Sequence, residues 1–371
     1  MFENILGQKL AVKLLKNAAK TDRLAGTYLF HGPSGVGKEF ASKEFAKALN
    51  CETRHGDSCD ECSSCQRIGQ NKHPDVYWVF PVGKKRVIKI SQIREMQRFA
   101  SMRAFEAKKK VCVIVDAHTL NEQSSNALLK TLEEPPPNTV FILVTDSPET
   151  LLPTIRSRSQ DVRFISLEKS VLSVILTGKM GVPANEAEVL SQLGLGSMGR
   201  AVSYKDEDTK NLRKFILDLL EKGPMNKMKD LTDNIDRILE MLEDYKEKLE
   251  KQMKQASSRE NEDGEKDDEE DAGRDEDAFI QGEYKKRVED VLSFFISWYR
   301  DILIYKNTKN SAAVMNKDYL EAVIQWSEGA DNDKLCGKLD VVADIRGLLN
   351  KQINLKLLLQ AMFLRLDTIN G

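Results

Sequence analysis

The order of apolar and polar positions divides the chain into two regions of different character. Through the first 166 residues, short continuous apolar segments alternate with stretches of helical periodicity. Strands that are apolar throughout and are separated by helices are typical of a parallel β-sheet covered on both faces. We therefore predict an α/β domain at 1–166, with strands at 27–31, 76–80, 111–115, 140–144 and 162–165.

Beyond residue 166 the strand signals end and helical periodicity takes over. We predict a small helical domain at 167–204 and an all-α domain at 205–371. A long amphipathic helix near 284–305 carries four aromatic residues that we interpret as its packing core: Phe294, Phe295, Trp298 and Tyr299.

One segment of the all-α region, 255–277, is highly charged and contains almost no apolar residues. Such a segment cannot offset the entropy that it loses on ordering. We predict a mobile insertion or a solvated extension of the flanking helices. An acidic segment that mimics nucleic acid or binds a basic partner is the alternative interpretation.

Composition narrows the class of protein. The chain has 371 residues and a formal net charge of −2, which excludes a strongly basic DNA-coating protein. No apolar run approaches the about 20 residues of a membrane span, and the first residues are polar and amphipathic, unlike a secretion signal. We therefore expect a cytoplasmic protein. Six cysteines are too few for a disulfide scaffold in a chain of this length.

A glycine-rich motif lies between the first predicted strand and a helical pattern. It matches the first seven positions of the P-loop, in which backbone N–H groups surround phosphate oxygens. The helix N-terminus and a lysine add positive charge there. The motif predicts a site for ATP or ADP, and a glycine-rich turn without a ligand is the alternative. The candidate nucleotide-binding residues are Gly32, Ser34, Gly35, Gly37 and Lys38.

Two departures from the P-loop pattern argue against hydrolysis. Glu39 stands where Ser or Thr normally places a hydroxyl on Mg²⁺, so that it either ligates the metal itself or leaves the pocket empty. Asp116 ends the third predicted strand as a metal-side carboxylate, but Ala117 stands where a second acid would activate water. Loss of a general base typically costs about 10²–10⁴-fold. We therefore expect little or no ATPase activity, and the binding of ATP or ADP stays open.

Four of the six cysteines form an independent motif, C-x7-C-x2-C-x2-C. Thiolates at this spacing converge on a tetrahedral Zn²⁺, and four of them leave no position for water. The motif predicts a structural zinc module at 51–65; four free thiols are the alternative, and His55 is a substitute ligand that the set does not need. Cys112 and Cys336 lie among apolar residues and are expected in the core. The predicted zinc ligands are Cys51, Cys59, Cys62 and Cys65.

Two arginines, Arg156 and Arg158, lie in a short segment after the fourth predicted strand. Guanidinium groups suit phosphate oxygens, and an outward-pointing Arg158 can complete the site of a neighbouring subunit as an arginine finger. A solvated loop or an intramolecular ion pair accounts for the two residues equally well. The preceding helical pattern ends before Pro135 and is, on its periodicity alone, that of an ordinary amphipathic helix.

Together these motifs resemble the bacterial DNA polymerase III clamp-loader subunits of the AAA+ class. The resemblance covers about residues 6–200 and depends most on the P-loop followed by the four-cysteine module, and on the segments 126–135 and 155–158. It implies a RecA-like AAA+ domain, a small helical lid and a helical collar that joins five subunits in a ring. The collar matches only in its helical character, and the segment 255–277 is not part of the family pattern.

Within this family the ATPase subunits (gamma/tau) keep the complete P-loop and an Asp-Glu pair, whereas delta prime is often degenerate at both. Glu39 and Ala117 make this chain more similar to the delta prime type. The family's Ser-Arg-Cys finger motif corresponds to residues 157–159, which implies that Arg158 acts in trans on the ATP of an adjacent subunit. Thr145 and Arg200 match the two sensor positions of the family.

The resemblance further implies gamma/tau and delta subunits, the sliding clamp and primed DNA as partners, in a component of the DNA polymerase III holoenzyme that has no polymerase activity itself. The first alternative is an active gamma/tau-type ATPase subunit that uses Lys38 and Asp116. A stand-alone zinc-containing DNA-binding module is a second alternative, although the near-zero net charge argues against it. A small-molecule phosphotransferase is a third, for which the sequence offers no evident acceptor-site acid.

Overall fold

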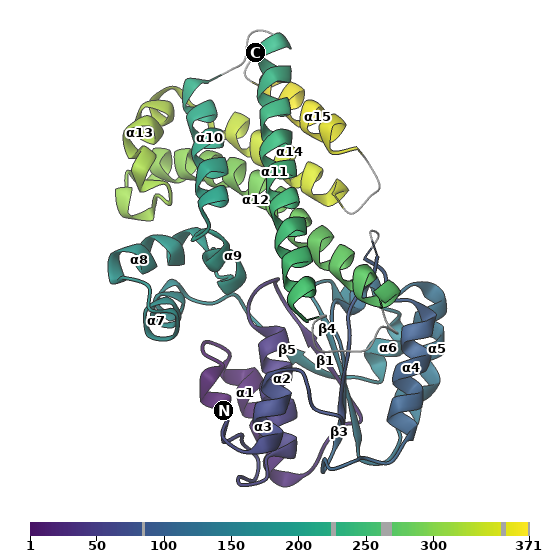
Figure 1. Ribbon diagram of the computed structural model, residues 1–371. Coiled ribbons are helices and arrows are strands. Elements are labelled where there is room, and N and C mark those ends of the chain that lie inside the picture. Colours follow the sequence, from purple (N-terminus) through teal and green to yellow (C-terminus); the bar gives the residue numbers. More distant parts are fainter. Residues whose placement is uncertain (84–85, 224–227, 261–268, 350–353, 370–371) are drawn as a thin grey trace. The chain divides into compact units, whose positions relative to one another are not determined.

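The computed structural model describes residues 1–83, 86–223, 228–260, 269–349 and 354–369. The chain divides into two compact units, Met1–Ser203 and Tyr204–Gly371. The first unit combines a β-sheet with helices, and the described part of the second is helical (Figure 1).

The sheet of the first unit has five parallel strands in the order β2-β3-β4-β1-β5. This confirms the predicted α/β fold, and each strand lies within two residues of its predicted segment. The difference is largest at β5, where the edge residues Gln160 and Asp161 are exposed and polar and therefore carry no apolar signal. The strands are β1 (Thr27–His31), β2 (Val76–Val79), β3 (Lys110–Ile114), β4 (Thr139–Thr145) and β5 (Gln160–Arg163).

Helices cover both faces of the sheet, as the continuous apolar strands predict (Figure 1). Because side chains alternate along a strand, Tyr28 and Phe30 pack with Phe45 on one face, whereas Leu29 packs with Leu128 on the other. The first face is covered by α1 (Lys9–Thr21), α2 (Lys38–Asn50) and α3 (Ser63–Gly69). The second is covered by α4 (Ile90–Ser101), α5 (Glu122–Glu133) and α6 (Pro153–Ser157).

Three further helices complete the first unit. A 2.8 Å backbone hydrogen bond from Leu167 N–H to the carbonyl oxygen of Gly196 joins the residues before the first of these helices to the turn before the third. Leu172, Leu176 and Leu190 are buried between the helices. The helices are α7 (Lys169–Met180), α8 (Ala184–Leu193) and α9 (Met198–Ser203).

The second unit packs around α12, whose aromatic residues form the core that the sequence predicts. Phe294, Phe295 and Trp298 are at most 1% exposed. The carboxylate of Asp301 accepts hydrogen bonds from the backbone N–H groups of Met315 and Asn316, which fixes the turn after this helix. The helices are α10 (Glu207–Lys222), α11 (Met228–Glu260), α12 (Glu269–Thr308), α13 (Leu320–Gly329), α14 (Asn332–Leu348) and α15 (Leu355–Thr368).

The predictions for the two cysteines outside the four-cysteine motif differ in outcome. Cys112 is fully buried in the sheet, as predicted. Cys336 is exposed, so its predicted place in the core is wrong. Its neighbour Leu335 is buried, because consecutive residues of a helix point in different directions and only one of them faces the core.

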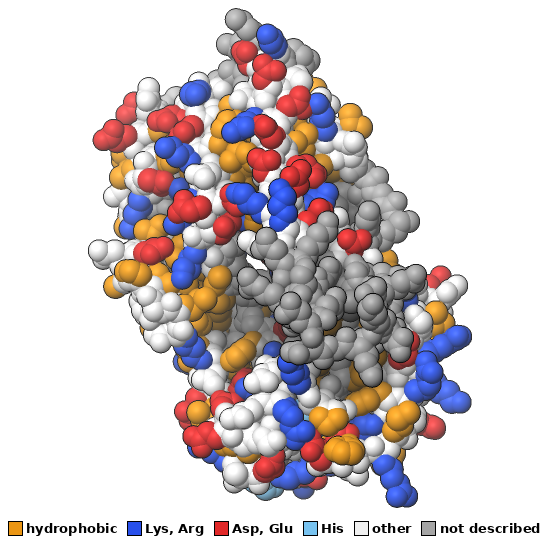
Figure 2. Space-filling view, in the orientation of Figure 1, with side chains coloured by type: hydrophobic (Ala, Val, Ile, Leu, Met, Phe, Trp, Pro, Cys, Tyr) orange, Lys and Arg blue, Asp and Glu red, His pale blue; other side chains and the backbone are white. Residues whose placement is uncertain are grey.

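The charged segment 255–277 divides between two helices and a gap. Residues 255–260 continue α11 and residues 269–277 begin α12; residues 261–268 lie outside the described part of the chain. On the face drawn in Figure 2, Lys and Arg side chains are interspersed with Asp and Glu over the second unit. None of the described helices is both long and apolar enough to cross a bilayer.

We predict that Asp75, which precedes β2, stabilises the first unit in a pH-dependent way. Its buried carboxylate accepts backbone N–H bonds of 2.8–2.9 Å from Phe105, Glu106 and Ala107. Burial raises the pKa of Asp75, but these bonds outweigh it and leave the pKa below its usual value. Asp75→Asn should cost about 2–3 kcal/mol at neutral pH, because it loses hydrogen bonds to a charged acceptor.

Thermal unfolding over a range of pH tests this prediction. Since the pKa is lower in the folded than in the unfolded chain, the advantage of the wild type is complete above about pH 4 and is lost as the pH falls. Glu149→Gln, which changes an exposed carboxylate of the same unit, is the control. A constant difference between Asp75→Asn and wild type at all pH values would contradict the prediction.

Candidate functional site

The glycine-rich motif forms the turn between β1 and α2. Gly32, Gly35 and Gly37 have φ angles of 144°, 73° and 93°, which L side chains rarely adopt. A Cβ on Gly32 would also lie 2.2 Å from the carbonyl oxygen of Phe164. The sequence folds into this loop because glycine fits these positions best. Ser34 is exposed at the tip of the loop.

Lys38 is buried at the first position of α2 and binds its own loop. Its ammonium donates to the carbonyl oxygens of Gly32 and Pro33, each at 2.6 Å. Burial lowers the pKa of Lys38, and the carboxylates of Asp146 and Asp116 act in the opposite direction. The predicted loop, its lysine and Asp116 are therefore brought into one electrostatic neighbourhood, together with Asp146, which the sequence analysis did not single out.

Asp116 lies two residues beyond the end of β3 and is paired with an arginine. Its carboxylate oxygen is 2.6 Å from the guanidinium of Arg86. The next residue, Val87, exchanges two backbone hydrogen bonds with Val82. The sequence contains Arg86 in a basic cluster at 84–86, but a contact across 30 residues leaves no periodic signal. Asp116 is thus engaged by a cation of its own chain.

Thr145 ends β4 in a small polar group. Its hydroxyl accepts a 3.1 Å hydrogen bond from the N–H of Ser147 and lies 3.4 Å from Nδ1 of His118. The same ring nitrogen is 3.3 Å from a carboxylate oxygen of Asp146. Thr145 and His118 therefore adjoin the Asp146 carboxylate, which raises the pKa of Lys38 against the lowering effect of burial.

The start of α9 lies directly on the glycine-rich loop. The carbonyl oxygen of Gly35 accepts hydrogen bonds from the N–H groups of Met198 and Gly199, at 2.8 and 3.2 Å. A Cβ on Gly199 would lie 3.4 Å from the Cα of Gly35, so the two glycines permit a close backbone contact. Arg200 follows as the next residue of this helix and is half-buried.

Arg158 lies apart from this neighbourhood, directly after α6. Its guanidinium pairs with the carboxylate of Glu133 and donates to the carbonyl oxygen of Thr154 at 3.0 Å. Of the interpretations left open by the sequence, the isolated chain shows the intramolecular ion pair. Glu133 is a residue that the sequence analysis left in an ordinary amphipathic helix.

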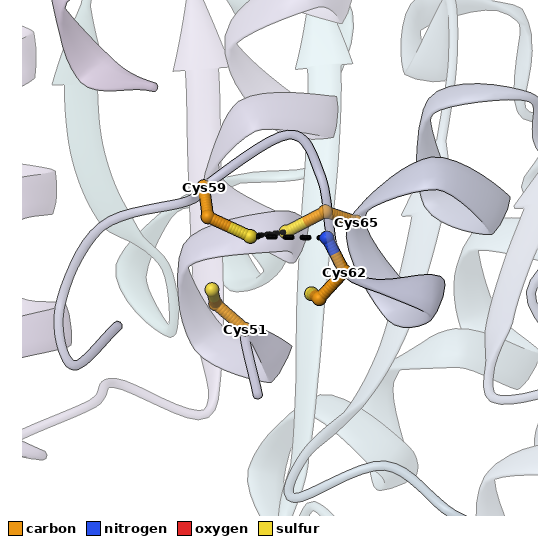
Figure 3. A group of neighbouring side chains, drawn as sticks. All are labelled: Cys51, Cys59, Cys62 and Cys65. Carbon is orange, nitrogen blue, oxygen red and sulfur yellow. Dashed lines mark hydrogen bonds between the residues drawn. The ribbon is translucent and has the colours of Figure 1, made fainter. Parts of the chain in front are cut away.

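The four cysteines of the C-x7-C-x2-C-x2-C motif converge (Figure 3). Their sulfur atoms all lie within 4.8 Å of one another, and Cys59 Sγ is 4.0 Å from Cys65 Sγ. Bonds of about 2.3 Å to a tetrahedral metal place thiolates roughly 3.8 Å apart. The set therefore fits a four-thiolate metal site. His55 is exposed and is not in this cluster.

Helix ends position these thiols. Cys51 directly follows α2, and Cys62 and Cys65 lie at the start of α3. Backbone N–H groups of Cys62 and Glu61 donate to Cys59 Sγ at 3.2 and 3.4 Å. Hydrogen bonds from Thr53 and from the N–H of Cys62 lower the pKa of Cys59 to about 6, whereas burial raises the pKa of Cys65. Such N–H donors stabilise the thiolate form that binds metal.

Two protein-family models match the chain, one in each unit. Residues 7–168 match the model described as DNA polymerase III, delta subunit. Residues 280–368 match the model described as DNA polymerase III, delta subunit, C terminal.

Curated relatives match part of the chain. The chain is 38% identical over 165 residues to DNA polymerase III subunit delta′ of Bacillus subtilis, which covers 44% of this chain and 50% of the relative. It is 36% identical over 216 residues to subunit tau of the same bacterium, which covers 56% of this chain and 37% of the relative. The chain thus spans half or less of the length of these relatives.

Among solved structures, a DNA polymerase III gamma-subunit-related protein of Thermotoga maritima aligns over 97% of this chain and 99% of its own length. The TM-score is 0.41 and the sequence identity is 16%.

We predict that the four-cysteine cluster holds one metal ion per chain and that this metal stabilises the loop 51–65. Cys62→Ser should remove the bound metal and lower the melting temperature by more than about 5 °C, because metal binding is coupled to folding of the loop. Elemental analysis and thermal unfolding measure both effects. Cys336→Ser, at an exposed cysteine outside the cluster, should change neither. A metal-free preparation as stable as the metal-containing one would contradict this role.

Proposed function

Since the chain belongs to the AAA+ clamp-loader family of DNA polymerase III, we propose that it is a delta-prime-type subunit that does not hydrolyse ATP itself. Its partners are gamma/tau-type and delta subunits in a hetero-pentameric ring. The ring loads the sliding clamp onto primed DNA, and this subunit supplies Arg158 to ATP bound by a neighbouring ATPase subunit.

The observation that carries this proposal is a phosphate loop without a neighbouring group for water activation, whose charged groups are paired within the chain. The Lys38 ammonium is bound to two carbonyl oxygens of its own loop, and the carboxylate of Asp116 is paired with Arg86. Ala117, the next residue, offers no group that can orient or deprotonate water. Metal binding and water activation are both required for hydrolysis, so the local chemistry favours a structural subunit.

The surroundings of the loop support the same conclusion. Glu39, exposed in the first turn of α2, brings a carboxylate rather than a hydroxyl to the edge of the loop. A negative charge suits the N-terminus of a helix but repels triphosphate oxygens. Backbone N–H groups at the start of α9 donate to the carbonyl oxygen of Gly35. The small helical segment α7–α9 therefore contacts the glycine-rich loop directly.

The support for Arg158 is its place on a rigid element near the surface. Its backbone N–H donates to the carbonyl oxygen of Ile155, and the Ile155 side chain is fully buried. The guanidinium itself is partly exposed, at 31%. A cation held by a packed helix and reaching solvent suits stabilisation of charge on a phosphoryl group of another subunit.

For the four-cysteine cluster we propose zinc in a structural role. Four thiolates complete a tetrahedral shell and leave no open position. A bound Zn²⁺ would supply cross-linking of α2, the loop 51–65 and α3, and no catalytic water. The polar N–H donors to Cys59 and the convergence of the sulfur atoms support this assignment.

A second candidate is an active gamma/tau-type ATPase subunit, favoured by the longer match to subunit tau, 216 residues against 165 for delta′. The purified chain distinguishes the two. We expect no Mg²⁺-dependent ATP turnover above background, and Lys38→Ala should leave that background unchanged. Rapid turnover that Lys38→Ala abolishes would establish the second candidate instead.

We predict that Arg158→Ala leaves ring assembly intact and lowers clamp loading by the complex at least about tenfold, since an arginine finger contributes a factor of 10³–10⁵ to kcat. The measurements are steady-state ATP turnover and clamp loading by the reconstituted complex. Arg103→Ala, at an exposed arginine of the same unit outside this segment, is the control. Unchanged turnover and loading in Arg158→Ala would defeat the finger assignment.

A further inference from the structure

Arg158 already has an anionic partner within its own chain. One guanidinium nitrogen bonds to the carboxylate of Glu133, and another donates to the carbonyl oxygen of Thr154 at 3.0 Å. Glu133 is the last residue of α5, and Arg158 directly follows α6; the two helices lie side by side (Figure 1). Any phosphate that is to receive Arg158 must compete with this carboxylate.

The backbones on both sides of the pair are fixed by the core. Leu128 and Leu132 of α5 are at most 4% exposed, and Ile155 of α6 is fully buried. The helices therefore hold the two side chains within reach of one another. Only rotation of the side chains themselves can separate Arg158 from Glu133.

The ion pair between Arg158 and Glu133 is suited to holding Arg158 reversibly. The side chains are 31% and 54% exposed, and ion pairs at such positions are weak and screened by salt. The Arg158 Nε atom is buried without a hydrogen-bond partner among the described residues, so one donor of the guanidinium remains unused in this position. A triphosphate offers more charge and more acceptor oxygens than a single carboxylate.

We propose that Glu133 is a positioning residue that holds Arg158 in a resting orientation and releases it to the phosphates of a neighbouring subunit. This proposal depends on the proposed trans role of Arg158. Glu133 and the phosphate oxygens compete for the same guanidinium, so removing the Glu133 charge raises the population of Arg158 that is free to engage. A weak pair shifts that population by a factor of about two to five.

The test uses the full chain in a complex reconstituted with its gamma/tau-type and delta partners. Glu133→Gln keeps the shape of the side chain and removes its charge. Glu134→Gln removes the same charge from the next residue, which is also exposed, and is the matched control. ATP turnover is measured without clamp and DNA, and again with both present. Thermal unfolding of each free subunit establishes that the variants are folded.

Glu133→Gln is expected to raise turnover without clamp and DNA about two- to fivefold, to change the stimulated rate by less than about twofold, and to leave thermal unfolding unchanged. Glu134→Gln should match the wild type in all three measurements. If Arg158→Ala lowers turnover but Glu133→Gln equals its control, the restraint is overturned and the finger stands. If Glu133→Gln lowers turnover, Glu133 supports the engaged state and the restraint is likewise overturned. If Arg158→Ala has no effect, the proposed function itself fails.

Discussion

The pairing of β1 with β4 on one side and β5 on the other is the constraint on which the rest of the first unit depends. His31 at the end of β1 is in register with Thr145 of β4 and with Arg163 of β5. Parallel strands bring their carboxyl ends to one edge, so the phosphate loop after β1 and the polar group after β4 meet there. A slip of one residue would exchange the two buried faces of β1 and remove Tyr28 and Phe30 from their packing with Phe45.

Much of this fold could be predicted because its signals are local. Five apolar segments gave the strands to within two residues, and the cysteine spacing identified the cluster because all four thiols come from fifteen consecutive residues. The glycines of the loop likewise carry their own conformational requirement. The aromatic core of α12 followed from helical periodicity alone.

What the sequence could not supply are the partners that arrive from elsewhere in the chain. Arg86 reaches Asp116 across 30 residues, and Glu133 reaches Arg158 across 25. Neither contact has a period or a spacing rule, since both depend on how two loops or helices are placed by the sheet. The prediction that Cys336 lies in the core was wrong for a related reason, because apolar neighbours in sequence do not establish which face of a helix a residue occupies. These ion pairs decide whether a charged group is available for chemistry, so the availability of the site residues was less predictable than their identity.

Helix α2 joins two places that the sequence presents as separate motifs. It begins at Lys38, inside the phosphate loop, and its last residue precedes Cys51 of the thiol cluster. Thirteen residues make a rod about 20 Å long, with Phe45 anchored in the aromatic core midway along it. At the Cys51 end the helix is also held by Ala48 and Leu49, which pack in the same core. The four-cysteine cluster therefore anchors the C-terminal end of the helix whose first residue is Lys38.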